Sequence, residues 1–257
     1  MTNLAGRTVV VTGASAGIGR AVALAFGSAG CRLVLAARRR EKLAELERAL
    51  RERHGAESLT MELDVRDRGA VESTLGALPS AWSQVDLLIN NAGLGRGLDK
   101  LQEGNPDDWD EMIDTNVKGL LYVTRALLPG MVARKRGHVI NIGSVAGREV
   151  YPGGNVYCAS KFAVKALTRA LKVDLLGTPI RVSTIDPGMV ETDFSVVRFR
   201  GDEERAAKVY QGLKALSAED IADIALWIAA RPPHVDITEL VVMPTAQATA
   251  MLNHREP

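Results

Sequence analysis

The chain has 257 residues, of which 46% are hydrophobic, 25% are charged and only 4% are aromatic, and its formal net charge is +1. This composition is typical of a globular protein with an aliphatic core, and it excludes fibrous and disordered chains. The near-neutral charge leaves no basic excess to neutralise a phosphate backbone, so we expect no nucleic-acid partner.

The cysteines, the histidines and the absence of long apolar segments further limit the kind of protein that this chain can be. Cys31 and Cys158 form neither a disulfide framework nor a CxxC pair, so the chain is compatible with a reducing compartment. The four histidines share no metal-ligand spacing, so we expect no metal site. The chain lacks the roughly 18 uninterrupted apolar residues of a membrane span and the apolar region of a signal peptide. We therefore expect a cytoplasmic protein without a membrane partner.

Short apolar runs alternate with segments of helical periodicity along the whole chain, beginning with a strand and then a helix that contains Ile18, Val22 and Phe26. The predicted strands are residues 8–12, 32–36, 58–63, 85–89, 138–142, 180–185 and 239–243. Near-continuous apolar strands separated by helices predict a parallel sheet that is covered on both faces. The expected fold is α/β, a doubly wound, Rossmann-type sheet of seven parallel strands in a single domain, residues 1–257.

One long segment, residues 187–220, has no strand character and mixes glycine, arginine and acidic residues. In open α/β sheets an insertion of this kind often covers the ligand crevice. We therefore expect a substrate lid near residues 189–215.

A glycine-rich turn connects the first predicted strand to the first helix, with glycines at Gly13, Gly17 and Gly19. Glycines let a pyrophosphate approach the backbone, and a helix N-terminus offers unpaired N–H groups at the positive end of its dipole. The turn predicts a dinucleotide site. The alternative is a tight turn that needs glycine for its own geometry.

Arg38 and Arg39 follow the second predicted strand, where an NAD site would place a carboxylate against the ribose hydroxyls. A guanidinium can instead hold the 2'-phosphate of NADP through forked hydrogen bonds. The sequence therefore favours NADP over NAD. The same arginines would also suit a solvated first turn of the second helix.

Tyr157 and Lys161 are four residues apart in a predicted helix, so their side chains project from one helical face. A phenol with an ordinary pKa of about 10 is a poor base at neutral pH, but a nearby ammonium and a nicotinium ring favour the phenolate. Tyr157 could then act as an acid and a base. Because this spacing also occurs by chance on helix surfaces, the interpretation depends on neighbouring motifs.

Further polar residues follow two predicted strands, at the edge where open α/β sheets bind ligands. The Ser144 hydroxyl could stabilise charge on a substrate oxygen during hydride transfer, although a serine here also suits a turn. Asn91 and Gly93 could contact a cofactor or support their loop. Asn116 is a weak helix former, and its amide could hold backbone or a water relay to Lys161.

Taken together and in order, from about residue 6 to residue 245, these motifs resemble the short-chain dehydrogenase/reductase family. The resemblance implies a catalytic tetrad of Asn116, Ser144, Tyr157 and Lys161, in which Tyr157 transfers the proton to or from the substrate oxygen. It also implies that Lys161 holds the nicotinamide ribose hydroxyls. The family likeness further implies a homotetramer, formed through the helices around residues 109–134 and 156–176.

The resemblance also implies a set of cofactor contacts, with Asp64 and Val65 beside the adenine and Pro187, Gly188 and Thr192 beside the nicotinamide amide. The full expected set is Gly13, Ser15, Gly17, Ile18, Gly19, Arg38, Arg39, Asp64, Val65, Asn91, Ala92, Gly93, Tyr157, Lys161, Pro187, Gly188, Val190 and Thr192. The chain departs from many NADP-preferring members of the family in carrying Ala16 where they have a basic residue. Discrimination between NADP and NAD would then depend on Arg38 and Arg39.

More narrowly, residues 112–119, 147–154 and 194–202 resemble the NADP-dependent 3-hydroxy acid dehydrogenases. This likeness implies hydride transfer between NADP and a small-molecule substrate such as serine or allo-threonine, with Ser144 and Tyr157 on its hydroxyl. A cationic side chain must then meet the substrate carboxylate, and Arg148 and Arg198 are the candidates. The sequence does not choose between them, and each also suits an ordinary surface arginine.

Two other functions remain compatible with the sequence. The same chemistry could serve a larger ketone, aldehyde, sugar or polyketide-like carbonyl, because the fold fixes the cofactor while residues 190–215 fix specificity. A non-catalytic NADP-sensing regulator is the second alternative. Such a regulator has no need for Tyr157 and Lys161 on one helical face beside Ser144.

Overall fold

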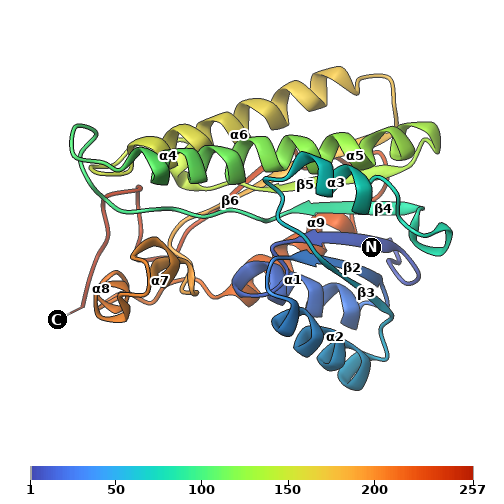
Figure 1. Cartoon of the computed structure of the whole chain (residues 1–257), viewed down its shortest axis with the longest axis horizontal. Helices are drawn as coiled ribbons and strands as arrows, with labels where there is room; N and C mark the ends of the chain where they lie inside the picture. The colour runs from blue at the N-terminus through green and yellow to red at the C-terminus, as the bar shows by residue number, and fades with distance from the viewer. Residues whose placement is uncertain (1, 257) are drawn as a thin grey trace.

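The computed structural model describes residues 2–256, and within this part of the chain one sheet of parallel strands has helices on both faces (Figure 1). The strand order is β3-β2-β1-β4-β5-β6-β7. The strands are β1 Thr8–Thr12, β2 Arg32–Ala37, β3 Ser58–Glu62, β4 Val85–Asn90, β5 Gly137–Ile142, β6 Ile180–Pro187 and β7 Glu239–Val242. The predicted doubly wound, Rossmann-type fold is therefore confirmed.

Helices follow the strands in the expected alternation. They are α1 Gly17–Ser28, α2 Arg40–His54, α3 Arg68–Thr74, α4 Pro106–Ile113, α5 Leu120–Ala133, α6 Asn155–Asp174, α7 Phe194–Arg198, α8 Glu203–Lys208 and α9 Ala218–Ala229. Helices α1, α2 and α9 cover one face of the sheet, and α3, α5 and α6 cover the other. Within residues 2–256, every helix is too short or too polar to cross a bilayer.

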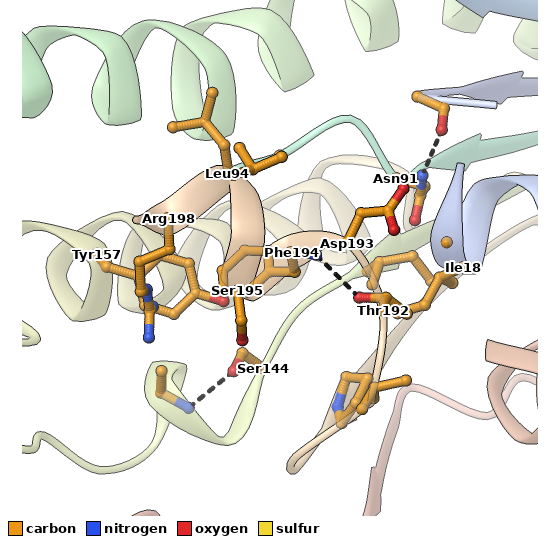
Figure 2. A pocket seen from close by; sticks show the side chains of 18 of the residues that line it. Ile18, Asn91, Leu94, Ser144, Tyr157, Thr192, Asp193, Phe194, Ser195 and Arg198 are labelled. Atoms are coloured by element: carbon orange, nitrogen blue, oxygen red, sulfur yellow. Dashed lines mark hydrogen bonds between the residues drawn. The ribbon is translucent and has the colours of Figure 1, made fainter. Parts of the chain in front are cut away.

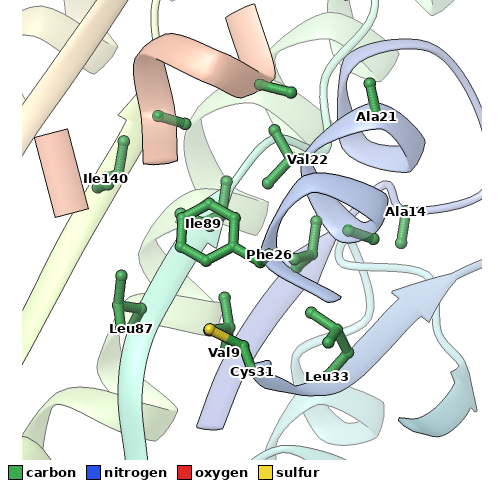
Figure 3. Close-up of a cluster of buried hydrophobic side chains, with 14 of the residues drawn as sticks. Val9, Ala14, Ala21, Val22, Phe26, Cys31, Leu33, Leu87, Ile89 and Ile140 are labelled. Atoms are coloured by element: carbon green, nitrogen blue, oxygen red, sulfur yellow. The ribbon is translucent and has the colours of Figure 1, made fainter. Parts of the chain in front are cut away.

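Each face of the sheet has its own aliphatic core. On one face, Phe26 of α1 is fully buried among strand residues such as Val9 and Ile89 (Figure 3). Truncating a buried phenylalanine of this kind to alanine costs about 3–5 kcal/mol, because both burial and packing are lost. Strands buried on both sides explain why the sequence shows continuous apolar runs rather than alternation.

The strand order places a topological switch between β1 and β4. The chain runs outward from β1 to β2 and β3, and then returns so that β4 pairs with β1 on its other side. The loops after β1 and β4 therefore leave the sheet in opposite directions and open a crevice at its carboxyl edge, which is where doubly wound folds bind ligands.

The structure adds detail to the sequence-based expectation in two segments. The helix expected around residues 109–134 is divided, because a π-helical turn, Asp114–Gly119, joins α4 to α5. A π-helical segment usually occurs as a single turn inside an α-helix, so the pattern of the flanking residues did not reveal it. The segment without strand character, residues 187–220, contains the short helices α7 and α8.

Candidate active site

A cavity of about 570 Å³ runs along the carboxyl ends of the central strands. The predicted residues that line it are Gly13, Ser15, Gly17, Ile18, Arg38, Arg39, Asp64, Val65, Asn91, Ala92, Gly93, Ser144, Tyr157, Lys161, Pro187, Gly188, Val190, Thr192 and Arg198. Three other predicted residues, Gly19, Asn116 and Arg148, lie outside the lining. The cavity thus brings together segments from nearly the whole length of the chain.

The glycine turn forms one wall of this cavity. Gly13 and Gly17 have φ angles of +65° and +50°, a conformation that other residues rarely adopt. A Cβ on Gly19 would lie 2.4 Å from the carbonyl oxygen of Gly13, so this glycine lets α1 approach its own turn. The N-cap residue, Ala16, gives no side-chain hydrogen bond. The first N–H groups of α1 are therefore available to an anion, which fits the pyrophosphate of a dinucleotide.

Asn91 supports this turn from the neighbouring strand. Its side-chain amide donates to the carbonyl oxygens of Thr12, at 3.0 Å, and Gly13, at 3.3 Å. The Thr12 hydroxyl in turn accepts from the backbone N–H groups of Asn91 and Ala92. Loop support, one of the two expected roles of Asn91, is therefore present, and the side chain also borders the cavity.

One end of the cavity is rich in arginine. Arg39 donates from Nε and Nη2 to the Ser15 hydroxyl at 3.2 and 3.1 Å. The Arg38 side chain is 52% exposed, and its Nη1 lies 3.9 Å from a carboxylate oxygen of Glu111. Burial opposes ionisation of Asp64, but hydrogen bonds and the charge of Arg66 lower the pKa of that carboxyl. Arg66, which the sequence analysis missed, thus offsets the negative charge that Asp64 would otherwise present to a phosphate.

Tyr157 and Lys161 lie on consecutive turns of α6 and face the cavity. The Lys161 ammonium donates to the carbonyl oxygen of Ile142 at 3.0 Å and lies 5.9 Å from the centroid of the Tyr157 ring. Burial lowers the pKa of Lys161 to about 8, although the charge of Asp186 opposes this shift. Burial raises the pKa of Tyr157, while the charge of Arg198 and hydrogen bonding by Ser144 lower it.

Asn116 lies in the π-helical turn and is 2% exposed. Its amide donates to the carbonyl oxygen of Leu94 at 2.8 Å and to the Ser160 hydroxyl at 3.0 Å, and its oxygen accepts from the Leu94 N–H at 2.8 Å. Asn116 therefore holds the loop after β4 against α6. A Cβ on Gly93 would lie 3.2 Å from Asn116 Oδ1 and 3.7 Å from Lys161 Nζ, so these two side chains approach each other across that glycine.

The structure separates the two candidate arginines. Arg148 donates from Nε to Asp186 at 2.7 Å and from Nη2 to Glu239 at 2.5 Å, so two carboxylates of the protein already engage it. Arg198 lines the cavity, where its Nη2 donates to the Tyr151 hydroxyl at 3.0 Å. Its Nε is buried without a hydrogen-bond partner. Arg198 is therefore the arginine that is free to donate hydrogen bonds to the carboxylate of a ligand.

Aromatic residues surround Arg198 at this end of the cavity. Its guanidinium carbon lies 4.9 Å from the ring centroids of both Tyr157 and Phe194. Figure 2 shows these three side chains together on one side of the pocket, away from Ile18 and Asn91 on the other. Sequence reasoning did not identify Tyr151 or Phe194 as site residues, although both occur in the stretches that resemble the hydroxy acid dehydrogenases.

Contacts from the loop after β4 hold α7 against the cavity. Arg96, in the loop after β4, donates from Nε to Glu111 at 2.6 Å and from Nη1 to the carbonyl oxygen of Val197 at 2.5 Å. The Gly97 N–H donates to the carbonyl oxygen of Arg198 at 3.1 Å. The C-terminal segment also borders the cavity, where Gln247 accepts from a backbone N–H. Nothing in the sequence pattern of that segment indicated this contact.

Comparison with known families agrees with this arrangement. The family model described as short chain dehydrogenase matches residues 7–217. The chain belongs to the short-chain dehydrogenase family. The family resemblance inferred from the motifs is therefore confirmed.

Individual short-chain dehydrogenases are similar to this chain over nearly their full lengths. The NADP-dependent 3-hydroxy acid dehydrogenase YdfG of Salmonella typhi is 48% identical over 249 residues, which are 96% of this chain and 99% of the relative. The NADP-dependent 3-hydroxy acid dehydrogenase of Schizosaccharomyces pombe is 42% identical, over 99% of this chain and 98% of the relative. A closed form of serine dehydrogenase complexed with NADP+ superimposes with a TM-score of 0.91 and 46% identity, covering 97% of this chain and 100% of that one.

Proposed function

We propose that this short-chain dehydrogenase transfers a hydride between NADP and a short 3-hydroxy acid of the serine and allo-threonine class. The observation that carries the substrate class is Arg198, whose guanidinium borders the cavity beside Tyr157 and has a buried Nε without a partner. Relatives named as NADP-dependent 3-hydroxy acid dehydrogenases, at 42 to 48% identity, support the same proposal.

The residues of the cavity fit NADP along its whole length. We assign the pyrophosphate to the N-terminus of α1 and the 2'-phosphate to Arg38, because its pair with Glu111 is long and its side chain is half exposed. Arg39 and Arg66 add positive charge at the same end. The predicted contacts at Pro187, Gly188, Val190 and Thr192 would hold the nicotinamide end. When bound, NADP supplies the hydride acceptor and NADPH the hydride donor.

Tyr157 is the acid and base in this proposal. In alcohol oxidation its phenolate accepts the hydroxyl proton while the C–H bond of the carbinol carbon breaks and its electron pair leaves as hydride. Ser144 donates to the substrate oxygen and limits its movement. Lys161 contributes positive charge and would hold the ribose hydroxyls. Asn116 acts indirectly, since its hydrogen bonds to Leu94 fix the loop beside Lys161.

The carboxylate anchor explains a preference for short substrates. A 3-hydroxy acid carries its carboxylate two bonds from the carbinol carbon, and Arg198 lies 4.9 Å from the Tyr157 ring. One small molecule could therefore reach both side chains. In this assignment Arg148 has a supporting role, because its pairs with Asp186 and Glu239 tie the segment after Ser144 to β6 and β7. Residues 189–215 form the lid over the acid.

We also propose that the protein is a cytoplasmic homotetramer. Apolar side chains remain exposed on the outer helices, including Leu121 of α5, Phe162 of α6 and Trp227 of α9, each at least 41% exposed. Contiguous exposed apolar patches often mark protein–protein interfaces, and Leu121 and Phe162 lie on the two helices expected to form this one. Both cysteines are buried free thiols, which suits a reducing compartment. Light scattering at assay concentration tests the assembly, and a monomer mass would contradict it.

The first experiment is an assay of NADP reduction followed by nicotinamide absorbance. Substrates are L-serine, D-serine, L-allo-threonine and 3-hydroxyisobutyrate, beside several carboxylate-free alcohols, and the series is repeated with NAD. Selective turnover of the acids with NADP is the expected result. Turnover of uncharged alcohols alone would contradict the substrate class while leaving the acid and base chemistry in place.

A further inference from the structure

The phenol of Tyr157 has two cationic neighbours rather than one. Lys161 comes from its own helix, at 5.9 Å from the ring centroid, and Arg198 comes from α7, at 4.9 Å. The other titratable groups nearby are the Tyr151 hydroxyl, the Cys158 thiol and, behind Lys161, the carboxylate of Asp186. Among these groups, the arginine has the closest cationic centre to the ring.

The two cations differ in how firmly they keep their charge. Lys161 is buried, its ammonium is hydrogen-bonded to a backbone carbonyl, and burial lowers its pKa to about 8. A guanidinium, by contrast, is never deprotonated in a protein at working pH. Burial raises the pKa of Tyr157, and the charge of Arg198 is the largest influence in the opposite direction. Arg198 therefore supplies a positive charge beside the phenol that does not depend on the protonation of Lys161.

Gly95 makes room for this arrangement. A Cβ at that position would lie 2.8 Å from Nη2 and 2.9 Å from Nε of Arg198, and 3.0 Å from the ring of Phe194. The N–H of Gly97 holds the carbonyl oxygen of Arg198 from the same loop. The loop after β4 thus holds the guanidinium of Arg198 over the Tyr157 ring.

We propose that Arg198 stabilises the phenolate of Tyr157 and thereby sets the pH range in which Tyr157 accepts a proton, in addition to anchoring the substrate carboxylate. This inference rests on the acid and base role of Tyr157 in the proposed function. It has a consequence for substrate choice. A bound carboxylate offsets the charge of Arg198, so Tyr157 holds its proton more firmly with a hydroxy acid than with an uncharged alcohol, which favours carbonyl reduction.

The direct test is the ionisation of Tyr157 itself, measured by tyrosinate absorbance in the protein saturated with NADP+. Subtracting the titration of the matching Tyr157→Phe variant in each background isolates this one phenol from the other tyrosines. The backgrounds are wild type, Arg198→Gln and Arg198→Lys. The control is Arg231→Met, because Arg231 follows α9, 4.5 Å from the ring of Trp227, and lies outside both the cavity lining and residues 189–215.

We expect the midpoint for Tyr157 to rise by about 1.2 to 2.4 pH units in Arg198→Gln, the effect of removing a unit charge about 5 Å away at an effective dielectric of about 20 to 40. The midpoint in Arg198→Lys should stay close to the wild-type value, and the midpoint in Arg231→Met should be unchanged. An unchanged midpoint in Arg198→Gln would overturn the proposal. Equal rises in the glutamine and lysine variants would also overturn it, because lost packing rather than lost charge would then be the cause.

The same variants separate this inference from the proposed substrate class. If kcat/KM for L-allo-threonine falls in Arg198→Gln while the Tyr157 midpoint stays fixed, the carboxylate anchor stands and the phenolate role is wrong. If the midpoint rises while turnover of the acid is retained, the phenolate role stands and the anchor is wrong. Circular dichroism and NADPH fluorescence establish that each variant is folded and binds cofactor.

Discussion

Replacing Gly95 by alanine should weaken the carboxylate site without removing any charged group. The added methyl carbon would lie 2.8 and 2.9 Å from two nitrogens of Arg198, whereas ordinary contacts are about 3.5–4.0 Å. The guanidinium must therefore retreat by roughly 0.6–1.2 Å. Its atoms are the far end of a flexible side chain, and the φ of Gly95 lies outside the left-handed region, so the fold should accept the change.

The magnitude follows from the loss of one well-placed charged hydrogen bond. Such a bond is worth about 1.5–3 kcal/mol, which corresponds to roughly 10- to 150-fold in kcat/KM. We expect a loss in this range for L-allo-threonine oxidation with NADP+, and a clearly smaller loss for a carboxylate-free alcohol, each measured at its own pH optimum. The melting temperature should change little.

Gly69→Ala is the matched control, because Gly69 also has an ordinary φ and a Cβ there would meet its nearest neighbour at 3.4 Å, in α3 and outside the cavity lining. Unaltered turnover of L-allo-threonine by Gly95→Ala would refute the reasoning, since the guanidinium would then be free to move at no cost. Equal losses for the acid and the uncharged alcohol would refute it as well.

Three further changes test other parts of the structure. Arg38→Asp should shift the NADP/NAD ratio of kcat/KM toward NAD by at least about tenfold, because a charge-assisted hydrogen bond is replaced by repulsion; an unchanged ratio would contradict the phosphate assignment. Asn116→Ala leaves the N–H and carbonyl of Leu94 without partners, so urea unfolding should show a loss of about 1–3 kcal/mol or more; wild-type stability would mean that the loop finds other partners. Lys161→Met should stabilise the cofactor-free protein at pH 7 by up to about 3 kcal/mol, because the folded pKa of about 8 lies below the unfolded value of about 10.4. Since the unfolded chain binds the extra proton between these values, wild-type stability rises with pH there and the gain should vanish near pH 10.5; a gain independent of pH would contradict the assigned pKa.

Much of the fold and the cofactor side of the site follows from the sequence, because these features are local. Buried parallel strands carry continuous apolar runs, and the seven predicted strands agree with the structure to within two residues at either end. The glycine turn, the arginines after the second strand, and the tyrosine and lysine four residues apart each depend on short stretches of chain. Their order along the chain was enough to identify the short-chain dehydrogenase family, because such a combination rarely arises by chance.

Only the tertiary structure distinguished the two arginines proposed for the substrate carboxylate. Arg148 and Arg198 look equivalent in sequence, but Arg148 meets carboxylates 38 and 91 residues away, at Asp186 and Glu239, and is thereby removed from the cavity. Arg198 is left without such a partner and stacks on Tyr157, across a space that Gly95 keeps open. Charge pairing of this kind depends on which distant loops the folded sheet brings within a few ångströms, and no periodicity or local spacing encodes it.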